Sequence, residues 1–258
     1  MSDTFTTFAK LHIPGSPLIL FNVWDAGSAA AVERAGAKAV ATGSWSVAAA
    51  QGFHDAEGLP FDLAIANAAR IVGATKLPVS IDFEGGYATD PMRTAANVAA
   101  LAATGAIGCN FEDQVIGAVP RTLHSLGDQA ARIKAMRKAV GASFFINART
   151  DIFLAAPADA HDAAMVDAAI ERALAYADAG ASGFFVPGLV DLKLLEKVCK
   201  GSPLPVNFMA FPGAPTAAQV ALTGIARVSH GPGPYRLALK AFEEAARGVL
   251  GSQQGEQP

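Results

Sequence analysis

The sequence predicts a (β/α)8 TIM barrel, an α/β fold in which parallel strands form a closed inner barrel and helices cover it. Three observations predict this fold. Short runs rich in Val, Ile and Phe alternate along the chain with Ala-rich stretches of helical period. Strict alternation of strands and helices implies parallel strands joined by crossover helices. Eight such units fit within the 258 residues, as is typical of the barrel.

Each predicted strand is a short run rich in apolar β-branched and aromatic residues. The strands are expected at Leu18–Asn22, Ala39–Thr42, Pro78–Asp82, Ile107–Phe111, Phe144–Asn147, Gly183–Val186, Val206–Met209 and Ala226–Ser229. Between them, apolar residues recur with the period of a helix. The helices are expected at Ser28–Ala35, Phe61–Gly73, Pro91–Thr104, Asp128–Val140, Asp162–Ala179, Leu192–Cys199, Ala217–Thr223 and Tyr235–Val249.

Residues that begin and end helices agree with these boundaries. Glycines stand where left-handed C-caps belong, at Gly36, Gly105, Gly141, Gly180 and Gly224. Ser28 and Thr216 are placed as N-caps. The rival fold, an open doubly wound sheet, would carry a glycine-rich phosphate turn after its first strand, and Trp24–Ser28 is not such a turn. We expect one barrel domain over residues 1–251 and a polar, disordered tail over residues 252–258.

Composition and charge exclude several classes of function. Hydrophobic residues make up 52% of the chain and charged residues 17%, which favours a large buried core over disorder. The net charge is −3 and Lys and Arg are scattered singly, so the basic stripe of a nucleic-acid-binding protein is missing. Cys109 and Cys199 lie in apolar segments and are expected to be buried thiols. With no secretory signal and no apolar run of membrane length, we expect a soluble, cytoplasmic protein.

Acidic residues collect at the predicted C-terminal strand ends, where barrel enzymes hold their catalytic groups. Asp82 and Glu84 end the third strand. Glu112 ends the fourth, and Asp55 lies in the loop after the second. Because Asp82 and Glu84 are two residues apart, an extended backbone would point both carboxylates the same way. Converging carboxylates repel one another unless a cation neutralises them, and oxygen-only ligands favour Mg²⁺, or Mn²⁺, over zinc.

Two further groups at these strand ends suit an anionic ligand. Arg149, after the fifth strand, could bind a substrate carboxylate or stabilise a developing oxyanion. The alternative for Arg149 is a structural salt bridge to Glu112 or Asp151. Residues Thr42-Gly43-Ser44-Trp45 leave the second strand as a turn whose backbone N–H groups suit a carboxylate. For any single acid at a strand end, capping the next helix or pairing with an Arg is the ordinary alternative.

Five stretches at the strand ends form an ordered series. They read Asn22-Val23-Trp24-Asp25-Ala26-Gly27-Ser28, Ala41-Thr42-Gly43-Ser44, Pro78-Val79-Ser80-Ile81-Asp82-Phe83-Glu84-Gly85-Gly86-Tyr87, Phe111-Glu112-Asp113-Gln114 and Ile146-Asn147-Ala148-Arg149-Thr150-Asp151. In this order the chain resembles the isocitrate lyase/phosphoenolpyruvate mutase superfamily over about residues 18–230. The resemblance implies a Mg²⁺ enzyme in which the ion chelates a carboxylate and a 2-oxo oxygen and stabilises the enolate left when a C–C or C–P bond breaks.

The resemblance also implies the metal ligands. Asp82 is expected to bind Mg²⁺ directly. Asp55, Glu84 and Glu112 are expected to act mainly through metal-bound waters, in keeping with the waters that Mg²⁺ usually retains.

For the substrate and the assembly, the resemblance implies the following. The turn around Ser44 and Trp45 would hold the substrate carboxylate, and Arg149 would steady the charge near the reacting bond. Asn207, on the seventh strand, would face the substrate. The superfamily further implies a homotetramer in which the last helix is exchanged between neighbouring subunits.

The chain departs from the superfamily's lyases in the loop after the fourth strand. Their Lys-Lys-Cys-Gly-His motif is replaced here by Gly117–Leu126, which contains no cysteine. Cys109 lies within the fourth strand, where packing is its expected role. The lyases' glutamate beyond strand six is also missing, and the phosphonate mutases' Asn-rich gating segment is not recognisable. The loop Val115–Gly127 is long enough for a mobile lid, from which Arg121 and His124 could reach a substrate, although a surface role is the ordinary alternative for such a histidine.

Three functions remain open, with Arg149, Asp55 and His124 as the candidate catalytic residues. The first is a Mg²⁺-dependent C–C lyase or decarboxylase acting on a small 2-oxo acid through an enolpyruvate. The second is a phosphoenolpyruvate or phosphonopyruvate enzyme acting on a C–P bond, in which the turns Phe211–Pro215 and His230–Pro234 could cradle the phosphoryl group. The third is a 2-oxo-acid-binding protein without turnover.

Overall fold

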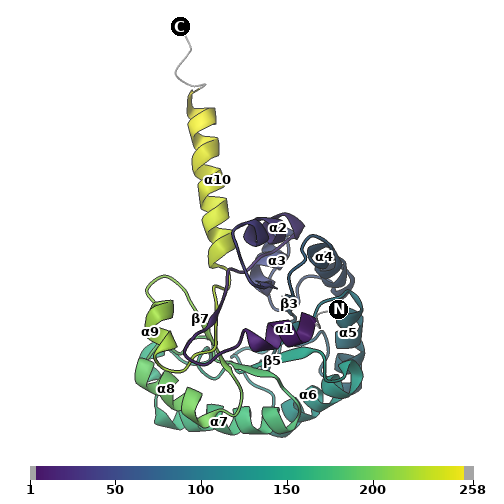
Figure 1. Ribbon diagram of the computed structural model, residues 1–258, viewed down its shortest axis with the longest axis vertical. Helices are drawn as coiled ribbons and strands as arrows, with labels where there is room; N and C mark the ends of the chain where they lie inside the picture. The colour runs from purple at the N-terminus through teal and green to yellow at the C-terminus, as the bar shows by residue number, and fades with distance from the viewer. Residues whose placement is uncertain (1–3, 253–258) are drawn as a thin grey trace.

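The structure, a computed structural model that describes residues 4–252, is a barrel of parallel strands surrounded by helices (Figure 1). The strands are β1 (Leu18–Leu20), β2 (Val40–Ala41), β3 (Val79–Asp82), β4 (Gly108–Glu112), β5 (Phe145–Arg149), β6 (Gly183–Phe185), β7 (Val206–Met209) and β8 (Arg227–Ser229). They pair in the order β1-β8-β7-β6-β5-β4-β3-β2, and every pair is parallel. The predicted (β/α)8 TIM barrel is confirmed. Residues 253–258 of the predicted tail lie outside the described range.

The barrel closes between β1 and β2 through a short contact. In the part of the chain that the structure describes, these strands form no ladder, and a single parallel bridge joins Val23 to Thr42. The Val23 N–H donates to the Ala41 carbonyl at 2.8 Å, and the Gly43 N–H donates to the Val23 carbonyl at 3.3 Å. The closure therefore lies at the C-terminal strand ends, next to the residues expected to bind the substrate.

All eight predicted helices are present, with ends that shift by a few residues. They are α2 (Ala26–Arg34), α4 (Phe61–Gly73), α5 (Pro91–Ala103), α6 (Leu126–Val140), α7 (Ala163–Asp178), α8 (Leu192–Gly201), α9 (Ala217–Ala221) and α10 (Gly233–Ser252). The apolar period did not predict the short helices α1 (Thr4–Lys10), α3 (Ser44–Ala50) and η1 (Ala158–Ala160). No described helix is long and apolar enough to cross a membrane.

The caps show why the helices start and stop where they do. Ser28 is not the N-cap of α2, as we had expected. Asp25 is the N-cap: its carboxylate accepts from the Ser28 N–H at 2.7 Å, and the Ser28 hydroxyl accepts from the Asp25 N–H, which forms a capping box. Thr216 caps α9 as predicted. The predicted C-terminal glycines are left-handed, with Gly36 at φ 92° and Gly180 at φ 101°, a conformation that costs glycine nothing.

The apolar core has two main parts. The larger part lies between the outer faces of the strands and the helices, where Cys109 is fully buried, as predicted. The smaller part fills the N-terminal end of the barrel, where Phe8 of α1 packs on Phe145 with ring centroids 5.2 Å apart. Burying a side chain such as Phe8 contributes about 2–3 kcal/mol. Cys199, which we expected to be buried, is partly exposed.

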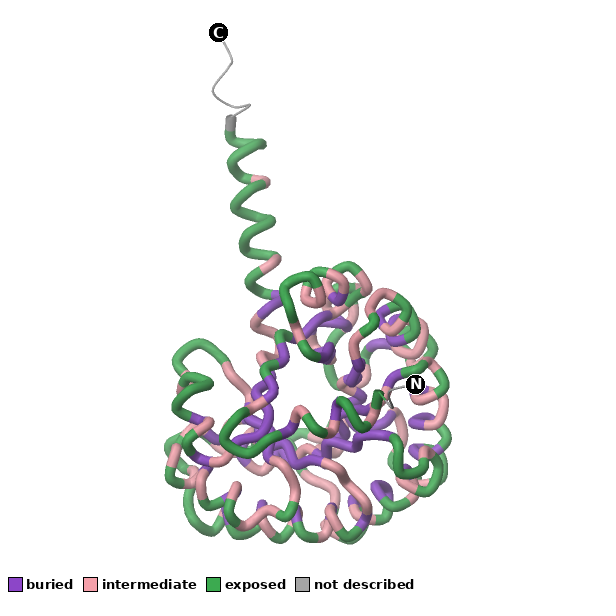
Figure 2. The backbone as a smooth tube through the Cα atoms, in the orientation of Figure 1, coloured by how far each residue is buried: buried purple, intermediate pink, exposed green. Residues whose placement is uncertain are grey.

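The last helix projects away from the barrel (Figures 1 and 2). Apolar side chains along it are exposed, namely Leu237, Leu239, Phe242, Val249 and Leu250. In a (β/α)8 barrel the helices form an outer ring over the strands. Because α10 stands off, Ile19 and Phe21 on the outer side of the β1 segment are 44% and 45% exposed, at the edge of a groove of about 510 Å³. The barrel thus has an uncovered apolar seam beside β1.

Candidate active site

A cavity of about 200 Å³ lies at the C-terminal ends of the strands. Six of the residues predicted for the site line it: Gly43, Ser44, Trp45, Asp55, Asp82 and Arg149. The other wall residues come from the ends of β1, β4, β6, β7 and β8 and from the loop after β4, and include Asn22, Asn110, Arg121, Phe185, Met209 and Gly231. The predicted residues that do not line this cavity are Thr42, Glu84, Glu112, His124 and Asn207.

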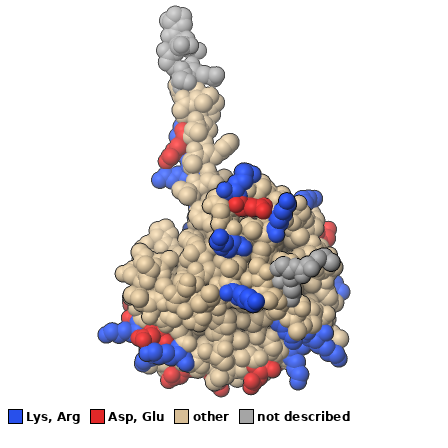
Figure 3. All heavy atoms as spheres, viewed as in Figure 1, with Lys and Arg blue, Asp and Glu red and all other residues tan. Residues whose placement is uncertain are grey.

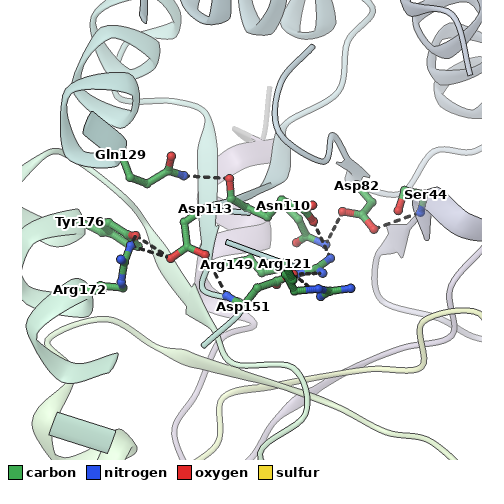
Figure 4. Close-up of polar contacts among 11 residues, drawn as sticks. Ser44, Asp82, Asn110, Asp113, Arg121, Gln129, Arg149, Asp151, Arg172 and Tyr176 are labelled. Carbon is green, nitrogen blue, oxygen red and sulfur yellow. Dashed lines mark hydrogen bonds and ion pairs between the residues drawn. The ribbon is translucent and has the colours of Figure 1, made fainter. Parts of the chain in front are cut away.

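Asp82, the last residue of β3, has both carboxylate oxygens held by neutral donors (Figure 4). The Ser44 backbone N–H donates to Oδ2 at 3.0 Å, and the Asn110 amide donates to Oδ1 at 3.3 Å. The Asp82 N–H donates to the Thr42 hydroxyl at 2.8 Å, which joins β3 to the end of β2. The residues Thr42–Trp45 are therefore not an open turn with free amides: Gly43 is the N-cap of α3, and the Ser44 amide is engaged by Asp82. Asp82 is fixed, and it carries no ion pair among the described residues.

Asp55 faces the same cavity from the loop after α3. Burial raises the pKa of Asp55, and the negative charge of Asp82 raises it further, against a hydrogen bond with the Ser44 side chain. The two carboxylates are thus close enough to repel each other. A cation between them would relieve this repulsion.

Glu84 does not point with Asp82 into the main cavity, which corrects our expectation. Its backbone is left-handed, with φ 49°, so the alternation of an extended strand ends before it. Its carboxylate accepts from the Glu57 N–H at 2.6 Å and lines a separate space of about 20 Å³ behind Asp82. Burial and the charge of Asp55 raise the pKa of Glu84 to about 8. Glu84 is therefore protonated at neutral pH when no cation is bound.

Arg149 forms the structural salt bridge that we considered as an alternative for it, and it does so with both Glu112 and Asp151. It is paired with Asp151 through two bonds of 2.5 and 2.9 Å and with Glu112 at 2.7 Å, and it also lines the cavity. Burial disfavours its charge, but the charges of Glu112 and Asp151 outweigh this and raise its pKa. Burial also raises the pKa of Glu112, partly countered by Arg149. Arg149 and its two acids form a preorganised group whose guanidinium faces the cavity.

Arg121 adds a second guanidinium from the loop after β4. It donates to Asp151 at 2.8 Å, so a single buried carboxylate holds both arginines (Figure 4). The loop is itself fastened by the antiparallel bridge between Gln114 and Leu123. Sequence reasoning placed Arg121 in the lid but not among the site residues. Its signal was a lone basic residue in the middle of a long loop after a barrel strand.

The position of Asp151 depends on a buried network behind it. Its N–H donates to Asp113 Oδ1 at 2.9 Å. The other oxygen of Asp113 accepts from Arg172 at 3.0 Å and from the Tyr176 hydroxyl at 2.8 Å, both on α7 (Figure 4). Asp113, Asp151 and Tyr176 are fully buried. Helix α7 therefore fixes the end of β5 from outside the barrel.

The remaining predicted residues lie around this site. Asn207 is buried inside the barrel, where its amide oxygen accepts from Asn147 at 3.1 Å, and so supports the floor rather than the wall. His124 lies at the far end of the lid loop. Burial lowers its pKa, and the charges that act on it come from Arg132, Asp128 and Arg172 rather than from the cavity.

These residues fit a magnesium site with two carboxylates at the cavity rather than the four that we had expected. Among the described residues, no three His, Cys, Asp or Glu side chains are grouped closely enough to hold a metal ion together. The carboxylate of Glu112 is ion-paired with Arg149, and the carboxylate of Glu84 accepts a hydrogen bond from the Glu57 N–H. Asp82 and Asp55 remain at the cavity, and one or two carboxylates with several waters are what Mg²⁺ commonly takes. The all-oxygen donor set suits this ion.

Comparison with known proteins gives consistent matches along the chain. The family model described as phosphoenolpyruvate phosphomutase matches residues 8–250. An uncharacterised protein of Mycobacterium tuberculosis is 36% identical over 249 residues, which cover 96% of this chain and 90% of that protein. The 2-methylisocitrate lyase of Escherichia coli K12 is 27% identical over 219 residues, which cover 80% of this chain and 73% of the lyase.

Solved structures agree with these matches. A crystal structure from Burkholderia cenocepacia J2315, provisionally named a phosphonomutase, is 48% identical, with a TM-score of 0.91 over 96% of this chain and 98% of that one. A phosphonopyruvate hydrolase in complex with oxalate and Mg²⁺ is 19% identical and shares the fold, with a TM-score of 0.83 over 96% of this chain and 88% of that one.

Proposed function

Since this chain belongs to the phosphoenolpyruvate phosphomutase family, within the isocitrate lyase/phosphoenolpyruvate mutase superfamily of enzymes, we propose that it is a Mg²⁺-dependent lyase or decarboxylase. Its substrate is a small 2-oxo acid, and the bond that breaks is the C3–C4 bond, one carbon away from the 2-oxo group, so that the electron pair of this bond forms an enolate. Named relatives in the superfamily include 2-methylisocitrate lyase and oxaloacetate decarboxylase.

One observation carries this proposal: opposite charges line the same small cavity. Asp55 and Asp82 supply the negative charges, and Arg149 and Arg121 supply the positive ones. A space of about 200 Å³ suits a molecule of a few carbon atoms. Acids that hold a cation on one side and guanidiniums that bind a carboxylate on the other are what a 2-oxo diacid requires.

The residues divide the work as follows. Asp82 would hold Mg²⁺ directly and Asp55 through water, and the bound ion would polarise the 2-oxo group and stabilise an enolate. Because the Ser44 N–H is engaged by Asp82, the N–H of Trp45 in the first turn of α3 would position the carboxylate next to the 2-oxo group. Arg149, held rigid by its two acids, would stabilise the negative charge that develops near the breaking bond without reorganising.

The loop after β4 shields the reaction from water. The ion pair between Arg121 and Asp151 closes it over the cavity. Excluding water protects an enolate from unwanted protonation and strengthens every charge interaction inside the site. Opening of this loop would admit the substrate and release the products.

The test is a substrate panel with and without divalent cation. The 2-oxo acid oxaloacetate is incubated with the protein in Mg²⁺ and in excess chelator, and the release of pyruvate or CO₂ is followed. The same is done for 2-methylisocitrate and related 2-alkyl malates, which are 2-hydroxy acids whose cleavage yields a 2-oxo acid. We expect turnover of at least one compound, lost in chelator and restored by Mg²⁺ or Mn²⁺. Undiminished turnover in chelator would contradict the proposal. Tight Mg²⁺-dependent binding of oxalate with no turnover of any compound would favour a binding protein instead.

A second candidate is cleavage or rearrangement of a C–P bond. The relative that is 48% identical is named a phosphonomutase, and Gly231 and Pro232 of the turn after β8 line the cavity, where they could contact a phosphoryl group. The other turn, around Phe211 to Pro215, borders a different groove. Phosphonopyruvate followed by ³¹P spectroscopy separates this candidate from the first.

We also propose that the protein is a homotetramer with exchanged α10 helices. The exposed apolar face of α10 and the uncovered seam at Ile19 and Phe21 are complementary in character. Figure 3 shows charged side chains of both signs on one stretch of α10. On the face shown there, Lys and Arg are spread over several elements with Asp and Glu among them.

Light scattering on a sizing column should give about four times the chain mass of 26.4 kDa. Phe242→Glu should reduce the assembly, whereas the control Lys240→Glu on the same helix should not. A wild-type monomer would contradict the proposed assembly.

A further inference from the structure

Arg227 is a buried cation to which the mechanism above gives no role. It is the first residue of β8, it is 1% exposed, and its side chain lies inside the barrel beneath the candidate site. Among the described residues it forms no ion pair. A charged side chain is rarely buried so completely without a partner of opposite charge.

The hydrogen bonds of Arg227 are too few and too long to offset the cost of burying its guanidinium. Nε donates to the Ser229 hydroxyl at 3.3 Å, and Nη2 donates to the Asn110 amide oxygen at 3.2 Å. Nη1 has no hydrogen-bond partner among the described residues. Both acceptors are neutral, so these contacts replace only part of the hydration that the guanidinium loses on burial. An arginine that served only to stabilise the fold would be expected to form more hydrogen bonds, or an ion pair.

The groups around Arg227 leave Asp82 as the carboxylate that balances it. Burial lowers the pKa of Arg227 to about 10, and the charge of Asp82 is the largest effect in the other direction. Burial, and then Arg227 itself, lowers the pKa of His12 to about 3, so this imidazole at the barrel's N-terminal end is neutral. Burial raises the pKa of Cys109, which keeps that thiol protonated. Arg227 therefore remains charged at neutral pH, and Asp82 is the carboxylate with which its charge interacts most strongly.

A side-chain link connects Arg227 to Asp82 across three strands. The Asn110 oxygen accepts from Arg227 and also from Asn147 at 2.9 Å. With its oxygen engaged twice, the amide must turn its N–H group toward Asp82 Oδ1, as Figure 4 shows. Arg227 thus lies behind the carboxylate proposed to hold the metal, on the side away from the cavity opening.

We propose that Arg227 is a positioning residue whose buried positive charge sets the charge balance of the site from below. It weakens the binding of a divalent cation alone and strengthens the binding of the anionic ligand. This inference rests on the proposed function. Its physical basis is that one fixed charge acts with opposite sign on a cation and on an anion held at the same place. Metal and ligand are then retained best together.

Calorimetric titrations of three proteins test the inference: the wild type, Arg227→Gln and Arg227→Lys. Each is titrated first with Mg²⁺ alone and then with oxalate in saturating Mg²⁺. Gln keeps a donor for Asn110 and removes the charge, whereas Lys keeps the charge. At an effective dielectric of about 20, a unit charge about 10 Å away changes the affinity for a singly charged ligand roughly tenfold, and that for a doubly charged ligand roughly a hundredfold. We expect Arg227→Gln to bind Mg²⁺ about a hundredfold more tightly and oxalate about a hundredfold more weakly, and Arg227→Lys to remain within about threefold of the wild type.

The control is Arg137→Gln. Arg137 is a partly buried arginine outside the barrel that binds the Gly180 carbonyl at 2.8 Å and the Ser182 hydroxyl at 2.9 Å. Its substitution should lower the melting temperature and leave both affinities unchanged.

Each outcome decides a different claim. If both affinities of folded Arg227→Gln shift in the same direction, or neither shifts, Arg227 is structural and the inference is wrong. Failure of both Arg227 variants to fold would lead to the same conclusion. If the wild type binds neither Mg²⁺ nor oxalate, the proposed function fails, and the inference fails with it.

Discussion

Replacing Tyr176 with Phe removes one oxygen atom from the network that holds the end of β5. Two hydrogen bonds are lost: Tyr176 to Asp113 Oδ2 at 2.8 Å and Arg172 to the Tyr176 hydroxyl at 2.8 Å. Asp113 is fully buried and keeps Arg172 as a partner, so it is not left uncompensated. A hydrogen bond to a charged group contributes about 1.5–3 kcal/mol, and we expect a loss of about 2 kcal/mol for the substitution. In a chain of this size that lowers the melting temperature by about 4–8 °C.

The assay is urea and thermal unfolding of both proteins at equal concentration, with Tyr87→Phe as the matched control. No hydrogen bond to the Tyr87 hydroxyl is formed within the described residues, while its ring packs on Phe61 and Phe83. Tyr176→Phe should also weaken oxalate binding, because Asp113 positions Asp151 and thereby Arg149. A loss of stability no greater than that of the control would refute the idea that this network is what holds the end of β5.

Three further predictions concern the acids and the loop. Burial raises the pKa of Glu84 in the folded state to about 8, above its ordinary 4.5. The folded protein therefore binds this proton more tightly than the unfolded chain does. With chelator present to remove metal, the protein should lose stability as the pH rises from about 4.5 to about 8. Glu84→Gln should flatten this dependence in melting curves at several pH values, and an unchanged slope would mean that Glu84 is ionised throughout. Asp82→Asn should abolish Mg²⁺-dependent oxalate binding in calorimetry, a loss of at least about a hundredfold, with a small change in melting temperature; retained affinity would place the metal elsewhere. Arg121→Ala should speed proteolysis between Val115 and Thr122 and weaken ligand binding, because it frees the loop from Asp151. Equal cleavage rates with and without this substitution would show that the ion pair does not hold the loop.

The fold could be predicted from sequence because each strand and helix carries its own periodic signal. Strand and helix positions agree to within a few residues, and the C-terminal glycines are left-handed where expected. The short helix α3 was missed because Ser44 to Ala50 fits neither a strand nor a long amphipathic helix. The N-cap of α2 was misplaced because Asp25 and Ser28 are both good caps, and only the backbone decides between them.

The site was predictable at the level of which strand ends meet, but not at the level of contacts. Alternation along an extended strand cannot foresee that the chain turns left-handed at Glu84, since that turn depends on Glu57 from another loop. Whether Arg149 pairs with Glu112 or Asp151 could not be settled either, because both acids lie within reach, and the structure uses both. Arg227 did leave a signal: a lone charge within an apolar predicted strand.

The left-handed residues around the acids have a consequence for how this protein can change. Ala56, Glu57, Glu84 and Tyr87 all have positive φ, and such residues cost of order 1 kcal/mol or more each. Glu57 ties their two loops together, since its N–H donates to Glu84 and its carboxylate accepts from the Tyr87 N–H at 2.7 Å. Mutations that alter one of these loops therefore disturb the other. Evolution or laboratory selection toward a new substrate has far more freedom in the loop that carries Arg121, where a single exposed residue such as Val119 can vary without moving the acids.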